Sequence, residues 1–399
     1  MPPAGTLELL TAPRAPVLGW SSYFGDDAAG SPCIWDAPHL RPTSSGRAAI
    51  ALALEAFGIR PGDRVLVPTY HCATMVAPIA ALGAEPVFFP IHPTGAPVVA
   101  VLDRLLDDRT RAIISPHYFG LPTPMAELRQ FCDARRLCLI EDCAHAFFGL
   151  SDLCPIGSWG DYAIASLPKF FPVAEGGCLA SWRHEFLPRP LHPRRLSEEA
   201  RALANALESG ARYGKLPGAN ALIKAAFALN ARVRRGGAPS QPDAGQATDL
   251  DVATLLSEFQ ANAIAFSRPT TVSWLLARHH GRQRLVSQRR RNYQGLAELL
   301  DGCPNARLLR PELPEAAVPY VLPLQVDNPE RYYQRIRASG VSLYRWDRVR
   351  WPGVPDFPED VGADWSQQIF QLSVHQDLNA VDIGNIARTI RAILSSSDT

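Results

Sequence analysis

Lysine is the residue type whose placement is most informative in this chain. Among its 40 lysine and arginine residues there are only three lysines, Lys169, Lys215 and Lys224. An arginine guanidinium stays protonated and cannot act as an amine nucleophile, so chemistry that needs an amine must use one of these three. Lys169 stands in the apolar segment YAIASLPKFFPV, where desolvation lowers the pKa of an amine and makes it a usable nucleophile. The alternative is a surface lysine whose amine is solvated.

Asp142 ends an apolar segment, LCLIED, that is typical of a buried strand. Ligands of α/β proteins bind at the carboxyl ends of such strands, although an aspartate there is also a common helix N-cap. Lys169 follows about one strand further along the chain. The pair fits pyridoxal 5'-phosphate (PLP), with the lysine forming a Schiff base and the aspartate keeping the pyridine nitrogen protonated.

A phosphorylated cofactor also needs an anion site, and Ser45-Gly46-Arg47 opens a predicted helix. The free N–H groups and the positive dipole end of a helix N-terminus suit a phosphate. An ordinary helix cap is the alternative interpretation. Ser166, three residues before Lys169, is a second candidate phosphate donor.

The elements that must position these residues alternate between strand and helix from about residue 44 to 182. The helix AAIALALEAFGI ends near Gly58, and RVLVP, EPVFFPI, RAIISPH and CLIEDCA are predicted strands separated by helical segments. Strands that alternate with helices form βαβ units. The sequence therefore predicts an α/β fold with a mainly parallel sheet flanked by helices.

The alternation of strands and helices ends after residue 182. Two helical segments form a predicted insert at about 190–236, and the loop GGAPSQPDAGQ approaches a domain boundary. Further helices, the strand VPYVLPLQV and a final helix near 380–395 complete the chain. We predict a large domain over 1–250 and a smaller C-terminal α+β domain over 251–399.

Composition excludes several other classes of protein. The formal charge of +1 shows no excess of basic residues, so neither nucleic acid nor an anionic membrane is expected as a partner. We see no signal peptide and no apolar run near the ~20 residues of a membrane helix. The eight cysteines include no Cys-x-x-Cys pair, which favours reduced thiols and a cytoplasmic protein. No metal site is predicted.

Four segments, in this order and spacing, resemble the DegT/DnrJ/EryC1/StrS family of PLP-dependent sugar aminotransferases. They are SSGRAAIALAL, PGDRVLVPTYHCATMVAPIAALGAEPVFF, PHYFGLPTPMAELRQFCDARRLCLIEDCAHAFFG, and Lys169 followed by EGG, and together they cover roughly residues 42–182. The resemblance implies fold type I, a homodimer, an amino-acid donor such as glutamate and a keto-sugar acceptor. It also implies that Lys169 forms the Schiff base and Asp142 binds the pyridine nitrogen. Ala144 then packs on one ring face, and His145 lies near the phenolic oxygen or is a core histidine.

The chain departs from the family pattern at three places. The family's Ser-Phe motif stands about two residues further from the lysine than Ser166 does, so the phosphate role of Ser166 stays open. Where the family has an aromatic ring over the cofactor, this chain has Cys72 beside His71, so either His71 covers the ring or the face is covered differently. The Gly-Tyr-Asn-x-Arg-like segment by which a neighbouring subunit completes the site is missing. The run Arg289-Arg290-Arg291 or the stretch around Arg278 could supply an arginine instead, or these could be solvated surface charges.

Two alternatives to transamination stay open. The same scaffold supports other PLP reactions such as dehydration or racemisation, because a fold does not fix a reaction. The retained Lys169 disfavours the sugar dehydratases of the family, which replace this lysine. A non-catalytic regulatory protein is the other alternative, and the departures from the family pattern are its support.

Overall fold

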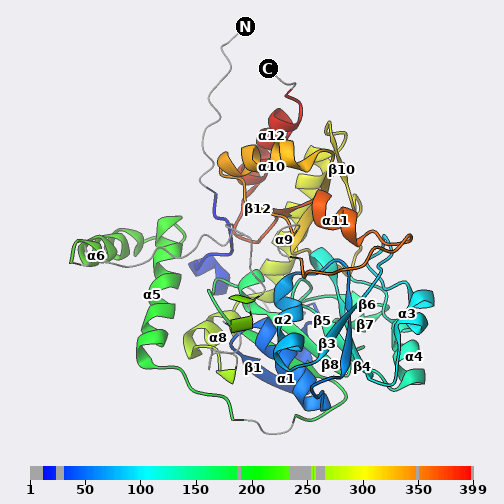
Figure 1. Cartoon of the computed structure of the whole chain (residues 1–399). Coiled ribbons are helices and arrows are strands. Elements are labelled where there is room, and N and C mark those ends of the chain that lie inside the picture. Colours follow the sequence, from blue (N-terminus) through cyan, green and yellow to red (C-terminus); the bar gives the residue numbers. More distant parts are fainter. Residues whose placement is uncertain are drawn as a thin grey trace.

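The computed structural model describes residues 12–23, 31–186, 190–233, 253–254, 256–257, 266–346 and 350–396. Two sheets organise them, a large one at the base of the molecule in Figure 1 and a small one above it. The predicted domain boundary near residue 250 and the loop GGAPSQPDAGQ lie outside the described residues.

The large sheet has seven strands in the order β1-β9-β8-β5-β4-β2-β3. Strands β2, β3, β4, β5 and β8 are parallel, while β9 pairs antiparallel with both β8 and β1. The predicted mainly parallel sheet is thus confirmed, with one strand, β9, running in the opposite direction to the others. The strands are β1 (His39–Thr43), β2 (Arg64–Pro68), β3 (Glu85–Phe89), β4 (Thr110–Pro116), β5 (Cys138–Asp142), β8 (Tyr162–Ser166) and β9 (Gly177–Ser181).

Helices cover both faces of this sheet because its strands are apolar on both sides. Along β2, Val65 and Val67 pack in the core that includes α1 (Gly46–Phe57) and α2 (Ala73–Ala81). Leu66, which points to the opposite face, packs with α3 (Val99–Leu105) and α4 (Ala126–Arg135). The alternation buries each face separately and leaves the carboxyl edge of the sheet for function.

Local signals fix both ends of α1. Ser45 is the N-cap, and its Oγ accepts a hydrogen bond from the backbone N–H of Ala48 at 3.3 Å. Gly58 is the C-cap with a φ of 88°, a left-handed conformation that glycine adopts without strain. The predicted helix and its end near Gly58 are confirmed.

The small sheet has four antiparallel strands in the order β10-β11-β13-β12. Side chains of α9, α10 and α12 form one apolar core with its inner face. These elements are β10 (Ala306–Leu308), β11 (Val321–Val326), β12 (Leu343–Tyr344), β13 (Ile369–Ser373), α9 (Arg282–Leu300), α10 (Pro329–Ala338) and α12 (Ala380–Leu394).

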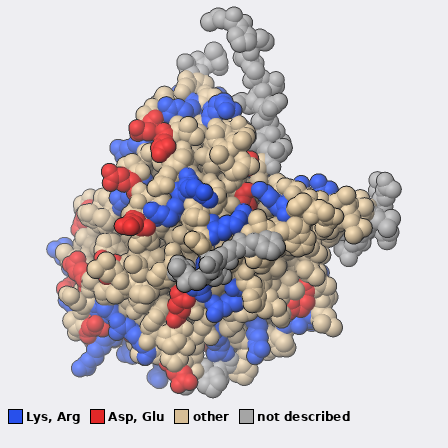
Figure 2. Space-filling model, turned by 180° about the vertical axis from the view of Figure 1, so that it is seen from behind, with Lys and Arg blue, Asp and Glu red and all other residues tan. Residues whose placement is uncertain are grey.

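Two helices of the predicted insert, α5 (Leu196–Arg212) and α6 (Asn220–Val233), lie beside the body of the molecule, with α6 reaching furthest outward (Figure 1). Figure 2 shows basic and acidic side chains intermixed on the opposite view, in keeping with the formal charge of +1. The remaining elements are α8 (Thr271–Arg278), α11 (Gly362–Gln368), the short pair β6 (Leu150–Ser151) and β7 (Cys154–Pro155), and the 3-10 turns Trp20–Tyr23, Ile34–Asp36, Tyr118–Gly120 and Leu167–Lys169.

Candidate active site

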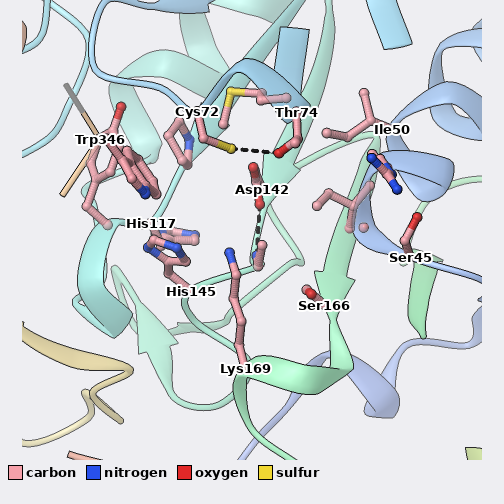
Figure 3. Close-up of a pocket in the computed structure, with 17 residues that line it drawn as sticks. Ser45, Ile50, Cys72, Thr74, His117, Asp142, His145, Ser166, Lys169 and Trp346 are labelled. Atoms are coloured by element: carbon pink, nitrogen blue, oxygen red, sulfur yellow. Dashed lines mark hydrogen bonds between the residues drawn. The ribbon is translucent and has the colours of Figure 1, made fainter. Parts of the chain in front are cut away.

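A cavity of about 280 Å³ lies at the carboxyl edge of the parallel strands (Figure 3). Strand ends and the N-termini of α1 and α2 surround it, because the chain leaves each strand at this edge. All of the predicted site residues except His71 line it, namely Ser45, Gly46, Arg47, Cys72, Asp142, Ala144, His145, Ser166 and Lys169.

Lys169 closes the short 3-10 turn that follows β8, and its side chain extends into the cavity toward Asp142 (Figure 3). Burial lowers the pKa of its amine below the ordinary value, and the nearby Cys72 and Asp142 oppose that shift. Lys169 Nζ has no hydrogen bond or ion pair with the residues that the structure describes, and it lies 5.6 Å from the ring centroid of Tyr320. This amine is therefore desolvated and available to a ligand.

Asp142 is the last residue of β5, and its side chain is 6% exposed. One carboxylate oxygen, Oδ1, accepts a hydrogen bond from the backbone N–H of Ala144 at 2.8 Å, as an N-cap would. Oδ2 has no hydrogen-bond partner among the described residues. Burial raises the pKa of Asp142, and the charge of Lys169 opposes the rise. A cationic ligand group at Oδ2 would pair with this carboxylate.

The opposite end of the cavity suits an anion. Ser45, Gly46 and Arg47 lie at the N-terminus of α1, and Arg47 forms no hydrogen bond or ion pair with described residues. Gly177 of β9 lets this helix end approach the sheet, since a Cβ there would lie 2.7 Å from the backbone nitrogen of Gly46. Ser166 also lines this end, so a hydroxyl, a guanidinium and helix N–H groups converge.

His145 packs against two aromatic rings of the C-terminal part of the chain, in tilted geometry, with ring centroids 4.6 Å from Tyr320 and 5.2 Å from Trp346. Its Nδ1 accepts a hydrogen bond from the backbone N–H of Phe119 at 3.4 Å. Burial and the charge of Lys169 lower its pKa well below the ordinary histidine value. A neutral imidazole therefore borders the cavity at neutral pH.

Of the two alternatives for the face of the cofactor ring, the structure does not support the one in which His71 covers it. His71 is fully buried outside the cavity, where its ring stacks on Phe88 at 5.0 Å. Its Nε2 accepts a hydrogen bond from the backbone N–H of Trp351 at 2.9 Å. Cys72 remains at the cavity wall, with Sγ 2.8 Å from Thr74 Oγ1. The alternative in which the face is covered differently is the one that the geometry favours.

Trp346 and His117 are among the residues of the cavity wall that sequence reasoning missed. Trp346 follows the short strand β12, and its ring packs against Tyr70 with the centroids 4.8 Å apart, so it supplies an aromatic ring from a distant part of the chain. Its aromatic side chain was the one feature in the sequence that could have indicated Trp346 as a cavity residue. His117 directly follows β4, and that position at a strand end could have identified it.

His117 also belongs to a cluster of residue types that can bind metals, together with Glu141 and Cys143. The hydrogen bonds of the fold already use its ligand atoms. His117 Nδ1 accepts from the backbone N–H of Thr123, and His117 Nε2 lies 2.7 Å from Glu141 Oε1. Glu141 also accepts three backbone N–H groups, those of residues 157, 159 and 160. The cluster is a structural network that fixes the end of β5.

Arg289 is not available to a partner subunit, contrary to the expectation for this arginine run. It is fully buried in α9 and donates hydrogen bonds to the backbone oxygen of Lys169 at 2.8 Å and to Gln376 Oε1 at 2.9 Å. Burial lowers the pKa of its guanidinium to about 9, so it stays charged at neutral pH. Arg289 connects helix α9 to the turn that holds Lys169, while Arg291 is exposed.

We expect Arg289→Ala to lower the free energy of unfolding by about 3 kcal/mol, because it leaves several buried acceptors unsatisfied and opens a cavity. Chemical denaturation of the purified variant measures this loss. Arg291→Ala in the same helix is the matched control, with an expected change of about 0.5 kcal/mol or less. Equal free energies of unfolding for the two variants would show that Arg289 does not stabilise the contact between α9 and the turn of Lys169.

The other two lysines lie away from the cavity. Lys215 Nζ donates a hydrogen bond to the backbone oxygen of Asp377 at 3.0 Å, and Lys224 is exposed on α6. Neither lines the cavity described above. Lys169 is the lysine that the structure brings together with an acid and an anion site.

The fold and the position of this lysine define the class of protein. A mainly parallel seven-stranded sheet with a smaller C-terminal α+β part is the fold of the fold type I PLP-dependent transferases. The chain superposes on PseC of Helicobacter pylori, an aminotransferase involved in the biosynthesis of pseudoaminic acid, with a TM-score of 0.63. That match covers 97% of this chain and 99% of PseC at 13% identity, which establishes the fold.

Residues 35–185 match the sequence model of the DegT/DnrJ/EryC1/StrS aminotransferase family, so the predicted resemblance is confirmed for this segment. GDP-perosamine synthase of Vibrio cholerae is 35% identical over 146 residues, which are 36% of this chain and 40% of that enzyme. L-glutamine:scyllo-inosose aminotransferase of Streptomyces griseus is 30% identical over 165 residues, 41% of this chain and 37% of that enzyme. The sequence match thus spans only about two fifths of these relatives.

Proposed function

We propose that this chain is a PLP-dependent aminotransferase that moves an amino group from an amino acid to a keto-sugar or a related cyclic ketone. The observation that carries the proposal is the desolvated, unpartnered amine of Lys169, which faces Asp142 in a cavity with an anion site. The names of the relatives support the substrate class, since they act on nucleotide-linked sugars and on cyclitol ketones.

The residues present fit PLP. Asp142 offers a carboxylate oxygen without a partner to the pyridine nitrogen, and the N-terminus of α1 with Arg47 offers an anion site to the phosphate. Ala144 would pack on one face of the ring, and His145 would lie near the phenolic oxygen. When bound, PLP supplies an aldehyde that condenses with amines and a ring that withdraws electrons from the substrate Cα.

Lys169 has two tasks in this proposal. Its neutral amine forms the covalent link to the cofactor, and after release it moves a proton at the substrate Cα. Both tasks need an amine that gives up its proton near neutral pH, and burial lowers the pKa of Lys169 in that direction. The neutral His145 beside it adds no second positive charge that would hinder substrate cations.

The purified protein should be yellow and should lose that absorbance on reduction with borohydride. A panel of donors (L-glutamate, L-glutamine) and acceptors (scyllo-inosose, 2-deoxy-scyllo-inosose, dTDP-4-dehydro-2,3,6-trideoxy-D-glucose) then tests transamination by mass spectrometry of the aminated product. Bound cofactor with loss of water or inversion at Cα instead would favour a dehydratase or a racemase. Absence of the absorbance would favour a non-catalytic protein.

A homodimer is part of the proposal. Leu203 on α5 and Leu222 on α6 are 44% and 75% exposed, and such apolar side chains favour a protein contact. We expect light scattering to give twice the mass of one chain. Double replacement Leu203→Asp and Leu222→Asp should shift the protein toward monomers, because charges would be buried at the contact. A wild-type monomer that transaminates would contradict the proposal that a second subunit completes the active site.

We propose a cytoplasmic location from the state of the cysteine thiols. All eight cysteines are unpaired in the structure, which supports a reducing environment such as the cytoplasm. In the described part of the chain, no helix combines the length and the apolar character needed to cross a membrane.

A further inference from the structure

A second cavity, of about 270 Å³, lies on the other side of Lys169. Lys169 lines both cavities, so this residue lies between the proposed cofactor site and a further space. The C-terminal part of the chain and the N-terminal segment 14–16 supply most of the second wall, including Tyr320, Tyr344, Ser373 and His375. None of these residues belongs to the segment that matches the family model.

The small sheet turns a polar face toward this cavity because side chains alternate along its strands. Leu343 and Leu372 pair across β12 and β13 and point into the apolar core of the small sheet. Their neighbours Tyr344 and Gln371 pair next to them and point to the opposite face. Ser373, two residues after Gln371, lies on the same face and lines the cavity.

The N-terminal segment forms a fixed wall of this cavity. The backbone N–H of Val17 donates to Asp377 Oδ2 at 3.1 Å, and Ser342 Oγ donates to the backbone oxygen of Arg14 at 3.1 Å. His375 Nε2 lies 2.9 Å from the backbone oxygen of Pro13. These hydrogen bonds hold residues 13–17 across the edge of the small sheet, so the cavity has a defined shape before any ligand enters.

Two polar groups of the lining remain available. His375 and Ser373 already bond to the N-terminal segment or to Ser342. The hydroxyls of Tyr320 and Tyr344, in contrast, form no hydrogen bond with the residues described here. Burial raises the pKa of Tyr320 above its ordinary value, so its phenol stays protonated.

The two unbonded tyrosine hydroxyls and the aromatic rings that carry them favour a neutral ligand with hydroxyl groups. Phenolic hydroxyls donate to and accept from alcohols, and aromatic faces pack against the C–H groups of a saturated ring. A carboxylate would call for a cation, and Arg14, the other cation of the lining, is exposed. A hydroxylated six-membered ring therefore fits this cavity better than the carboxylate end of an amino acid.

We infer that the second cavity binds the hydroxylated ring of the keto acceptor, and that Tyr344 is a specificity-determining residue for it. The inference rests on the proposed transaminase function. The acceptor ring lies between the small sheet and Lys169, with its carbonyl carbon toward the proposed cofactor site, where the cofactor would carry the amino group to be transferred. Tyr344 donates a hydrogen bond to a ring hydroxyl and leaves the amino-acid donor unaffected.

The two half-reactions can be measured separately, because each changes the absorbance of the bound cofactor. In Tyr344→Phe we expect kcat/KM with the fastest acceptor of the panel above to fall about 3- to 10-fold, the value of one neutral hydrogen bond. The half-reaction with L-glutamine should keep its wild-type rate. Tyr332→Phe, a tyrosine buried in the core of the small sheet, is the matched control and should change neither.

Two results would overturn the inference. Equal slowing of both half-reactions in Tyr344→Phe would place the residue in a general structural role, and an unchanged acceptor half-reaction would remove the acceptor from this cavity. A wild-type protein without cofactor absorbance, or one inactive with every acceptor, would instead contradict the proposed function. The two failures are thus distinguishable.

Discussion

Lys169→Arg should lose roughly 10²- to 10⁴-fold in kcat, the usual range for removal of a general acid–base group, and should no longer hold the cofactor covalently. The positive charge is kept, but a guanidinium stays protonated and cannot condense with an aldehyde. Turnover with the best donor and acceptor measures the first effect. Borohydride reduction followed by peptide mass spectrometry measures the second.

Lys215→Arg is the matched control for this experiment. Lys215 donates a single hydrogen bond to a backbone oxygen, which an arginine can also reach, so activity and labelling should be retained. In the wild-type protein the reduced cofactor should be found on the peptide that bears Lys169. Label on Lys215 or on the exposed Lys224 would assign the chemistry to a different site.

Asp142→Asn should retain bound cofactor and lose about 10- to 100-fold in kcat. The asparagine oxygen can still accept the backbone N–H of Ala144, so the end of β5 keeps its shape. What disappears is the charge that would stabilise a protonated pyridine nitrogen, and a charge-assisted hydrogen bond is worth about 1.5–3 kcal/mol. Steady-state kinetics and the absorbance of bound cofactor separate these two effects.

Asp103→Asn, at an exposed position on α3, controls for the general effect of removing a carboxylate. It should leave kcat unchanged. If Asp142→Asn turned over at the wild-type rate, another acid would have to bind the cofactor ring. If it lost the cofactor altogether, Asp142 would act mainly in binding.

The sequence alone was enough to predict those features whose signals lie within a single helix or strand. The ends of α1 follow from a serine that can cap and a glycine that accepts a positive φ, and both signals lie within one helix. Asp142 and Lys169 follow from apolar strands that end in a charged residue or a short turn. Parallel strands place such ends together whatever the rest of the chain does.

The rest of the site depends on contacts between distant segments, which a local pattern does not encode. His71 and Cys72 are neighbours, yet Phe88 and Trp351 fix His71 outside the cavity. Trp346 reaches the cavity from a two-residue strand without a distinctive spacing. Arg289 is the first of three consecutive arginines, and only its burial against the turn of Lys169 distinguishes it from the other two.

The two cavities that Lys169 lines can change independently during evolution, because different segments of the chain build most of each. The segment that matches the family builds most of one cavity, to which Trp346 is added. The C-terminal strands and the N-terminal segment, which lie outside it, build most of the other, together with Pro168 and Lys169. Substitutions at the second wall can alter which ketone is accepted while the amine, the acid and the anion site stay intact. The scaffold is modular in this sense, and exchange of the wall around Tyr344 is a route by which one transamination chemistry can be redirected to new rings.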